Sequence, residues 1–333
     1  MINKETIYIF YGSRSIGVIK KGGILISLTS MLKSKTHTHK EFQTILREAL
    51  PKKKSFRTIS GHAPFSSEYQ MIVPYTLTNP YKSFLVGIAF DYLARIMIAK
   101  MVKKNKEVSY INLTAEKGLT VMKLLMQKNK WAFFRLKRKY IKIIKKMKQC
   151  INGKKDIESL IPNTCFLAKL EQVYRSGMPP MDINKAFYTD PESDVINDLK
   201  QMCHTFQRYF LTDKVITPYS EVIYNPNFGV ASSFVGGADG DIFIDGTLYD
   251  FKSGKSKGYK WQEVAQLVGY FLLNELSAEL EEGFLHANKP LTIKRIAFYR
   301  ARYGEIEYFD ISSFHEPSIE QTKLDLMAFF KKQ

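Results

Sequence analysis

The chain has 333 residues and a formal net charge of +18. Hydrophobic residues make up 45% of it and aromatic residues 13%, which is enough apolar material for a packed core and excludes a largely disordered chain. A positive charge of this size favours DNA or RNA as a partner ahead of a membrane surface. The alternative is an AT-rich genome, which encodes many Lys, Ile and Asn residues.

The first third of the chain changes from a β-like to a helical pattern. Residues 5–30 hold two β-prone runs, at 7–10 and 23–26, and residues 33–60 are polar and basic. His37 and His39 alternate as on one strand face, but two histidines without a third ligand make a poor metal site, so we expect a solvated loop there. Apolar residues spaced three and four apart predict a helix over 82–104.

A second long helix is predicted over 115–149. Its C-terminal half interleaves apolar residues with lysines and arginines, among them Arg135 and Arg138. Two explanations stay open: an amphipathic helix with an ordinary solvated basic face, or a helix that lies along a phosphate backbone.

The remaining elements follow from apolar spacing and turn residues. We predict helices at 156–175 and 191–212, strands at 215–216, 221–224 and 233–235, a hairpin at 236–252, a helix at 260–280, strands at 293–300 and 306–311, and a last helix at 317–331. The apolar stretch 84–99 is interrupted by Asp91 and Arg95, which favours a core helix over a membrane span. The apolar run at 7–11 is too short for a signal peptide, so we expect a cytoplasmic protein with no membrane association.

The cysteines predict no chemistry. They lie far apart, without metal-ligand spacing, and their odd number argues against a disulfide framework. We expect reduced, buried thiols at Cys150, Cys165 and Cys203.

The hairpin at 236–252 carries the most informative pattern. Asp245-Gly246 between two β-prone runs is typical of a two-residue hairpin turn. With that turn, the cross-strand partners are Ile242 and Tyr249, Asp241 and Asp250, and Asp239 and Lys252. Cross-strand partners project to one face, as do residues two apart, so all four charged side chains would share a face.

Two opposed carboxylates repel each other, and a divalent cation removes that cost. Mg²⁺ prefers oxygen ligands and often takes only one or two protein carboxylates, so Asp241 and Asp250 suit it. Lys252 would hold the attacking water or neutralise charge on the phosphate. The alternative is a solvated surface hairpin with a weak Asp239–Lys252 pair. A calcium loop of the EF-hand kind does not fit the spacing.

Three motifs in this order resemble the PD-(D/E)XK nuclease superfamily, and within it the RecB-type branch that includes CRISPR-adaptation nucleases. Asp241-Ile-Phe-Ile looks like the first acidic motif, although Asp239 also fits its loose pattern. Asp250-Phe-Lys252 matches the (D/E)-x-K motif. Gln266 and Tyr270 match the Gln-x-x-x-Tyr helix motif that follows.

One upstream motif departs from that family. The branch usually has Gly-x-x-x-His on a helix, with the His as a metal ligand, and here Gly87-Ile-Ala-Phe-Asp91 stands in what looks like the same place. A carboxylate is a harder ligand than imidazole, so the site would lean further toward Mg²⁺ or Mn²⁺. Asp91 as a polar helix contact is the alternative, and Glu221 is a further candidate ligand.

The resemblance implies an α/β fold, with a mixed central sheet flanked by helices as in a restriction-endonuclease-like core. The segments would be an N-terminal region at 1–80, partly β, a core helix at 81–104, a largely helical basic insertion at 105–212, and the nuclease core at 213–333. The implied activity is Mg²⁺- or Mn²⁺-dependent hydrolysis of DNA, with RNA as a second possible substrate and with protein partners unidentified. The biological role would be antiviral defence, mobile-element biology or repair.

The resemblance also assigns roles to residues. The catalytic residues would be Asp241, Asp250, Lys252 and Gln266; the metal ligands Asp241, Asp250, Asp91 and Asp239; and the nucleic-acid contacts Lys255, Lys257 and Tyr270. The basic pattern of the 115–149 helix, which the resemblance does not cover, adds Arg135 and Arg138 to the nucleic-acid contacts. The missing His motivates a rival: a catalytically inactive nuclease fold that binds nucleic acid within a larger complex. A basic scaffold that docks on an acidic protein is the third hypothesis, and charge alone supports it.

Overall fold

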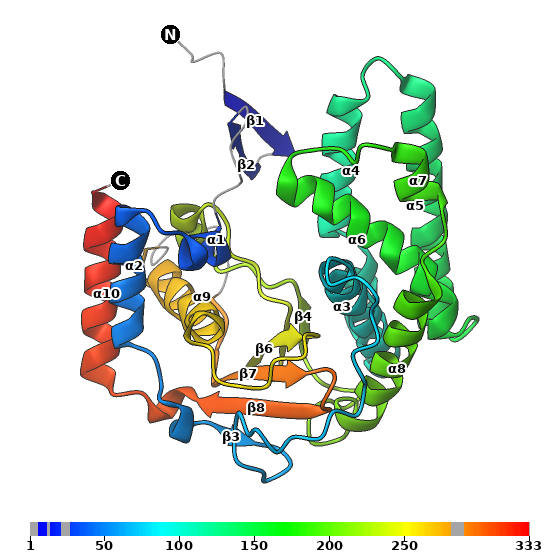
Figure 1. The fold of residues 1–333 in the computed structure, drawn as a ribbon. Coiled ribbons are helices and arrows are strands. Elements are labelled where there is room, and N and C mark those ends of the chain that lie inside the picture. Colours follow the sequence, from blue (N-terminus) through cyan, green and yellow to red (C-terminus); the bar gives the residue numbers. More distant parts are fainter. Residues whose placement is uncertain (1–5, 12–13, 21–26, 281–289, 333) are drawn as a thin grey trace.

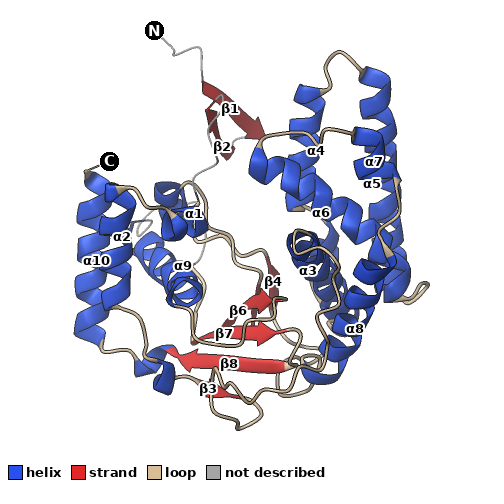
Figure 2. Ribbon diagram, viewed as in Figure 1, coloured by secondary structure: helices blue, strands red, loops and turns tan. Residues whose placement is uncertain are grey.

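The computed structural model describes residues 6–11, 14–20, 27–280 and 290–332. Six strands form one mixed sheet in the order β3-β8-β7-β6-β5-β4, with helices on both of its faces (Figure 2). The strands are β3 (Arg57–Thr58), β4 (Val222–Tyr224), β5 (Ile242–Ile244), β6 (Thr247–Lys252), β7 (Arg295–Arg300) and β8 (Glu305–Asp310). Two further strands, β1 (Thr6–Tyr11) and β2 (Arg14–Lys20), form a separate antiparallel pair.

The centre of the sheet is a parallel pair. β6 and β7 run in the same direction and are connected through the long helix α9 (Trp261–Leu280), whereas all other neighbours are antiparallel. Side chains alternate between the faces. Leu248 and Phe298 pack on the α9 side, while Tyr249 and Tyr299 pack on the opposite side. Both faces are therefore buried, which explains the nearly continuous apolar character of these strands.

The first face is covered by α9 together with helices from both ends of the chain (Figure 1). These are α1 (Leu28–Lys33), α2 (His37–Glu48) and α10 (Glu316–Lys331). α1 packs on α9 and α2 packs on α10, while β3 adds to the edge of the sheet beside β8. Residues 27–80 are thus part of the same body as the C-terminal sheet.

The second face is covered by a helical layer from the middle of the chain (Figure 1). It comprises α3 (Lys82–Met101), α4 (Thr114–Leu125), α5 (Lys130–Ile151), α6 (Ile161–Ser176), α7 (Ile183–Tyr188) and α8 (Ser193–Tyr209). α3 is apolar nearly all round, and it contacts α5, α6 and α8. α4 and α6 approach closely at Gly118, where an added Cβ would lie 1.9 Å from the Leu170 carbonyl oxygen.

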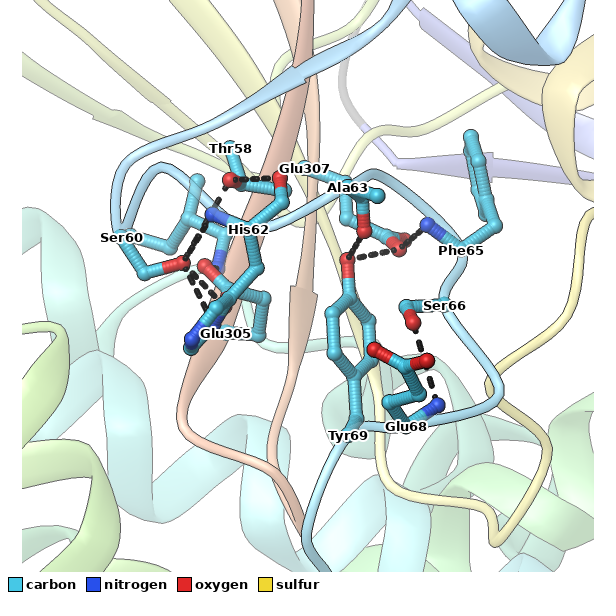
Figure 3. A network of polar contacts seen from close by, with 11 residues as sticks. Thr58, Ser60, His62, Ala63, Phe65, Ser66, Glu68, Tyr69, Glu305 and Glu307 are labelled. Carbon is cyan, nitrogen blue, oxygen red and sulfur yellow. Dashed lines mark hydrogen bonds and ion pairs between the residues drawn. The ribbon is translucent and has the colours of Figure 1, made fainter.

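Buried ion pairs connect the sheet to its surroundings. Arg302, just after β7, makes two hydrogen bonds of 2.7 and 2.6 Å to the carboxylate of Asp198 on α8. Arg300 Nε donates to Glu307 Oε2 at 2.8 Å. Figure 3 shows how residues 58–69 dock on β8: Ser60 Oγ donates to Glu305 Oε2 at 2.6 Å, and Tyr69 Oη donates to Glu307 Oε1 at 3.0 Å.

Most predicted elements are confirmed, including the hairpin turn and the pairing of Ile242 with Tyr249. The helix predicted over 115–149 is instead two helices, because Asn129 caps α5 by accepting a hydrogen bond from Ala132 N. The strand predicted at 233–235 was wrong, since 230–235 form a 3-10 helix between Gly229 and Gly236, which both have positive φ. The pair 215–216 belongs to no strand.

The loop predicted around His37 and His39 was also wrong. Both residues lie in the first turn of α2, where Thr36 accepts from His39 N, and Phe42 and Leu46 supply the buried face. The β-prone run at 23–26 lies outside the described residues. All three cysteines are buried and unpaired, as expected. Across the described ranges, no helix has the length and apolar character needed to cross a membrane.

Candidate active site at the end of strand β6

The two hairpin carboxylates lie side by side where the β5–β6 ladder ends. Pairing stops at Ile242 and Tyr249, so Asp241 precedes β5 and Asp250 sits within β6. Phe251 N donates a hydrogen bond of 2.6 Å to Asp241 Oδ2. This bond ties the Asp241 carboxylate to the backbone beside Asp250, although the two residues are not partners in a regular ladder.

A chain of polar contacts leads from Asp250 to helix α9. Lys252 Nζ lies 2.5 Å from Asp250 Oδ2 and donates to Gln266 Oε1 at 3.4 Å. Gln266 Nε2 in turn donates to Tyr270 Oη at 2.9 Å. The (D/E)-x-K and Gln-x-x-x-Tyr residues are therefore brought together, on the sheet face that α9 covers.

Asp91 reaches the same place from α3. Gly87, one turn earlier, lets this helix approach the end of β6, because a Cβ there would lie 3.0 Å from Ser253 Oγ. Within the described part of the chain, no hydrogen bond or ion pair reaches the Asp91 carboxylate. The Gly-x-x-x-Asp spacing thus has a local reason: the glycine allows the close approach, and the aspartate follows on the site.

The cluster is short of positive charge. Burial and the negative charges of Asp241, Glu171 and Asp250 raise the pKa of Asp91 well above its ordinary value. Burial and then Asp250 raise the pKa of Asp241 to about 7, against the opposing effects of Phe251 N–H and Lys252. Burial also raises the pKa of Asp250, although Lys252 opposes it. Three neighbouring acids with raised pKa values are costly to ionise together, and a cation beside them would reduce that cost.

Lys252 itself stays protonated in this arrangement. Burial lowers its pKa, but the carboxylates of Asp250, Glu263 and Asp241 outweigh that effect, so the pKa is raised above its ordinary value. An ammonium group held in this way is a donor and a positive charge, and it is not poised to accept a proton.

The site suits a hard divalent cation with two protein ligands. The described residues contain no group of three or more His, Cys, Asp or Glu side chains arranged to hold a metal ion. Mg²⁺ and Mn²⁺ often use one or two carboxylates and fill the remaining positions with water and phosphate oxygens. Asp250 Oδ2 is buried and, beyond its ion pair with Lys252, accepts no well-aligned hydrogen bond. The donor set of Asp241 and Asp250 fits such an ion.

Sequence reasoning missed several charged neighbours of this site. Glu263 lies one turn before Gln266 on α9, and Arg300 Nη1 donates to it at 3.0 Å. Arg300 itself is opposite Lys252 in the parallel β6–β7 register. Glu263 shares the Gln266 helix face, which the spacing of three residues could have indicated. Arg300 became identifiable only with the strand order.

The helical insertion also contributes a charged pair. Arg175 on α6 donates to Glu171 Oε1 at 2.9 and 2.5 Å, and Tyr92 Oη donates to Glu171 Oε2 at 2.6 Å. Tyr92 directly follows Asp91, so this pair borders the cluster. The Arg175 charge opposes the rise in pKa of both Asp91 and Asp241. An i, i+4 Glu–Arg pair is visible in the sequence, but its proximity to the hairpin is not.

Two predicted ligands lie elsewhere. Asp239 is exposed, and its carboxylate accepts from Asn227 Nδ2 at 3.4 Å, so it does not face Lys252 as the extended register predicted. The reason is that residues 239–241 leave the β5–β6 ladder and bridge to Asn227 instead. Glu221 lies at the turn end of the hairpin, where its N–H donates to Asp245 Oδ1, at the opposite end of the strands from Lys252.

Of the residues predicted to contact nucleic acid, some lie in or beside the site and others lie away from it. Tyr270 is 4% exposed and stacks on Phe228, so it supports the site from inside and cannot touch a substrate directly. Lys257 Nζ donates to Tyr69 O at 2.9 Å, which holds the loop after β6. Lys255 is exposed in that loop. Arg135 and Arg138 lie on α5, which is on the far side of α3 from the sheet (Figure 1).

A second polar cluster does not form a catalytic triad. Ser60, His62 and Glu305 lie together beneath β8 (Figure 3). Ser60 Oγ and Glu305 Oε2 both approach the same ring nitrogen of His62, Nδ1, at 3.0 and 3.3 Å. A serine–histidine–acid triad needs the nucleophile and the acid on opposite ring nitrogens. The cluster is therefore a structural contact of the 58–69 segment.

Comparison of the chain with protein-family models, curated proteins and solved structures gives no match.

Proposed function

We propose that this protein is a Mg²⁺- or Mn²⁺-dependent deoxyribonuclease of the PD-(D/E)XK type, with a restriction-endonuclease-like core formed by the sheet and α9. One observation carries the proposal: Asp241, Asp250 and Lys252 meet at the end of β6, with Asp91 and Gln266 brought beside them from two helices. The excess of buried negative charge in this cluster supports a cation as its missing member.

Each residue has a role that its contacts support. Asp241 and Asp250 would hold the ion, and Asp91 would supply a further oxygen, either directly or through water. A bound divalent ion polarises the scissile phosphate and lowers the pKa of water. Lys252, protonated and beside Asp250, would position that water and offset charge on the phosphate. Gln266 would fix the Lys252 ammonium through its 3.4 Å contact.

Nucleic acid as the substrate follows from charge. The net charge of +18 attracts phosphate polymers and speeds their encounter with the protein. DNA is proposed over RNA because the resemblance of the motifs implies it. A role in antiviral defence, mobile-element biology or repair belongs to the same proposal.

The rival function is an inactive nuclease fold that serves as a nucleic-acid-binding subunit. The observation in its favour is the aspartate at position 91, where the resembling family has a histidine ligand. Turnover separates the two functions, because both predict binding and only the first predicts cleavage.

The test is a cleavage assay on linear and circular duplexes, single-stranded DNA and RNA, with Mg²⁺, Mn²⁺ or EDTA. Asp245→Asn is the matched control, since Asp245 is an exposed aspartate at the turn end of the same hairpin. We expect metal-dependent cutting that is lost in Asp250→Asn and Lys252→Met and kept in the control. Binding without any cutting by folded wild-type protein would favour the inactive subunit.

A further inference from the structure

The outward face of α5 carries a continuous row of exposed side chains. Trp131, Arg135, Arg138 and Lys142 are spaced by four, three and four residues, so they lie along one side of the helix, and all four are exposed. We call these four residues, with the neighbouring Phe134, the α5 stripe. The opposite face of α5 is buried and packs into the helical layer through Leu136, Tyr140, Ile143 and Met147.

The segment that contains this stripe carries charge of one sign. Between Glu116 and Asp156 the chain has fourteen Lys and Arg residues and no Asp or Glu. A solvated helix face that served only solubility would tolerate both signs interspersed. A strongly basic segment of this kind attracts a polyanion, because each neutralised phosphate releases a condensed counterion.

The stripe also exposes aromatic rings, which solvation does not explain. Trp131 is 68% exposed and Phe134 is 55% exposed. The second tryptophan, Trp261, is instead covered by Arg47, whose guanidinium carbon lies 3.8 Å from the ring centroid. Because large apolar rings gain from burial, two of them on a basic surface indicate a partner with flat faces.

The cations of the stripe are ordered against these rings. The Arg135 guanidinium lies 5.0 Å from the Trp131 centroid and 4.6 Å from that of Tyr188 on α7. Arg138 lies 5.8 Å from the Phe134 centroid. Each guanidinium group of the stripe therefore lies beside an aromatic ring, and a strand that offers both bases and phosphates can contact both kinds of group.

We propose that the α5 stripe binds single-stranded nucleic acid, with bases stacked on Trp131 and Phe134 and phosphates on Arg135, Arg138 and Lys142. Unpaired bases are required, since a duplex hides the faces on which the rings would stack. A membrane surface fits less well, because a membrane-bound amphipathic helix exposes its apolar face, and the apolar face of α5 is buried in the protein. The inference rests on the proposed nuclease function only in treating the strand as part of the substrate.

Binding measured in EDTA tests the stripe separately from cleavage. Fluorescence anisotropy would follow labelled oligothymidylate, oligouridylate, an abasic strand of the same length, and a duplex. We expect Trp131→Ala/Phe134→Ala to weaken binding of the base-bearing strands by about tenfold or more. Binding of the abasic strand and the duplex should stay unchanged. Tyr219→Ala is the control, since Tyr219 is a 77% exposed aromatic outside the stripe.

The salt dependence of strand binding tests the phosphate contacts separately. Arg135→Gln/Arg138→Gln should reduce the salt dependence of strand binding by about one to two counterions. Lys52→Gln/Lys53→Gln removes the same charge from exposed lysines elsewhere and should reduce it less. The thymidylate and uridylate strands show whether DNA or RNA binds more tightly.

Three outcomes would overturn the proposal: unchanged strand binding in the aromatic variant, an equal loss with the abasic strand, or binding of anionic phosphatidylserine vesicles without binding of any strand. None of these bears on cleavage at Lys252. Conversely, a protein that binds strands through the stripe but never cuts them would refute the nuclease proposal alone.

Discussion

Replacing Asp241 by asparagine tests whether the carboxylate cluster is built for a cation. In the metal-free protein the pKa of Asp241 is raised from 3.8 to about 7, chiefly by burial and by Asp250. The folded state therefore holds a proton more tightly than the unfolded state. The stability linked to this group is fully present below the unfolded pKa, and it is lost as the pH rises through the folded value.

The size of the effect follows from the shift. Each pKa unit corresponds to about 1.4 kcal/mol, so a rise from 3.8 to about 7 means a loss of at most about 4 kcal/mol at alkaline pH. At about pH 5 the same relation gives a loss of stability of about 2 kcal/mol. Asparagine carries no charge and can still accept the hydrogen bond from Phe251 N. We expect metal-free Asp241→Asn to be more stable than wild type by about 2 to 4 kcal/mol at about pH 8, with a smaller difference at pH 5.

Urea unfolding measures this, with EDTA and with Mg²⁺. Wild type should gain stability from Mg²⁺, by about 2.7 kcal/mol at a hundredfold excess over the dissociation constant, whereas Asp241→Asn should gain little. Asp245→Asn serves as the control and should behave like wild type in both conditions. A variant that is less stable than wild type in EDTA at alkaline pH, or that gains as much from Mg²⁺, would refute the reasoning.

Three further predictions concern packing and positioning. Gly118→Ala should cost at least about 3 kcal/mol in urea unfolding, because the new Cβ meets the Leu170 carbonyl oxygen; a loss under about 1 kcal/mol would contradict the close α4–α6 contact. Asp198→Asn leaves Arg302 buried without its carboxylate and should lower the free energy of unfolding by about 3 to 5 kcal/mol in the same measurement. Near-wild-type stability of this variant would show that the pair does not stabilise the contact between the end of β7 and α8. Gln266→Ala should slow cleavage about tenfold while the gain in stability from Mg²⁺ stays unchanged, since Gln266 positions Lys252 and binds no metal in this account; an unchanged rate would remove Gln266 from the site.

The hairpin and the pairing of its residues were predictable because their determinants are local. Asp245-Gly246 fixes a two-residue turn, and the alternation of side chains then fixes which residues pair. The helical spacing of Gln266 and Tyr270 likewise predicts a shared face, and the structure places Gln266 against Lys252. Short-range rules therefore located Asp250 and Lys252 relative to one another, whereas only the resemblance of the motifs brought Gln266 to them.

The limits of local reasoning show at Asp239. A regular ladder would have continued past Asp241, but the chain leaves it at Gly240, where an added Cβ would lie 3.0 to 3.3 Å from side-chain atoms of Leu248, Pro226 and Phe228. Asp239 then bridges to Asn227, twelve residues earlier. Residues 225–227 are also typical of a turn. Nothing in the sequence showed that this turn would prevent the hairpin from continuing to Asp239.

The surroundings of the site depended on tertiary packing. Arg300 faces Lys252 because β6 and β7 are parallel neighbours, and the strand order is not encoded in either segment alone. Glu171 and Arg175 reach Asp91 because α6 packs on α3. These contacts join residues 48 to 84 positions apart, which periodicity within a window of about 18 residues does not reveal.

The most direct test of the central claim is the initial rate of DNA cleavage as a function of Mg²⁺ concentration, for wild type and for Asp250→Asn, with folding checked by thermal unfolding. We expect no cleavage in EDTA, a saturable rise in rate with Mg²⁺ in wild type, and a rate at least about a hundredfold lower in the variant at every concentration. A wild-type rate that is independent of the metal, or a folded Asp250→Asn protein that cuts as fast as wild type, would contradict it.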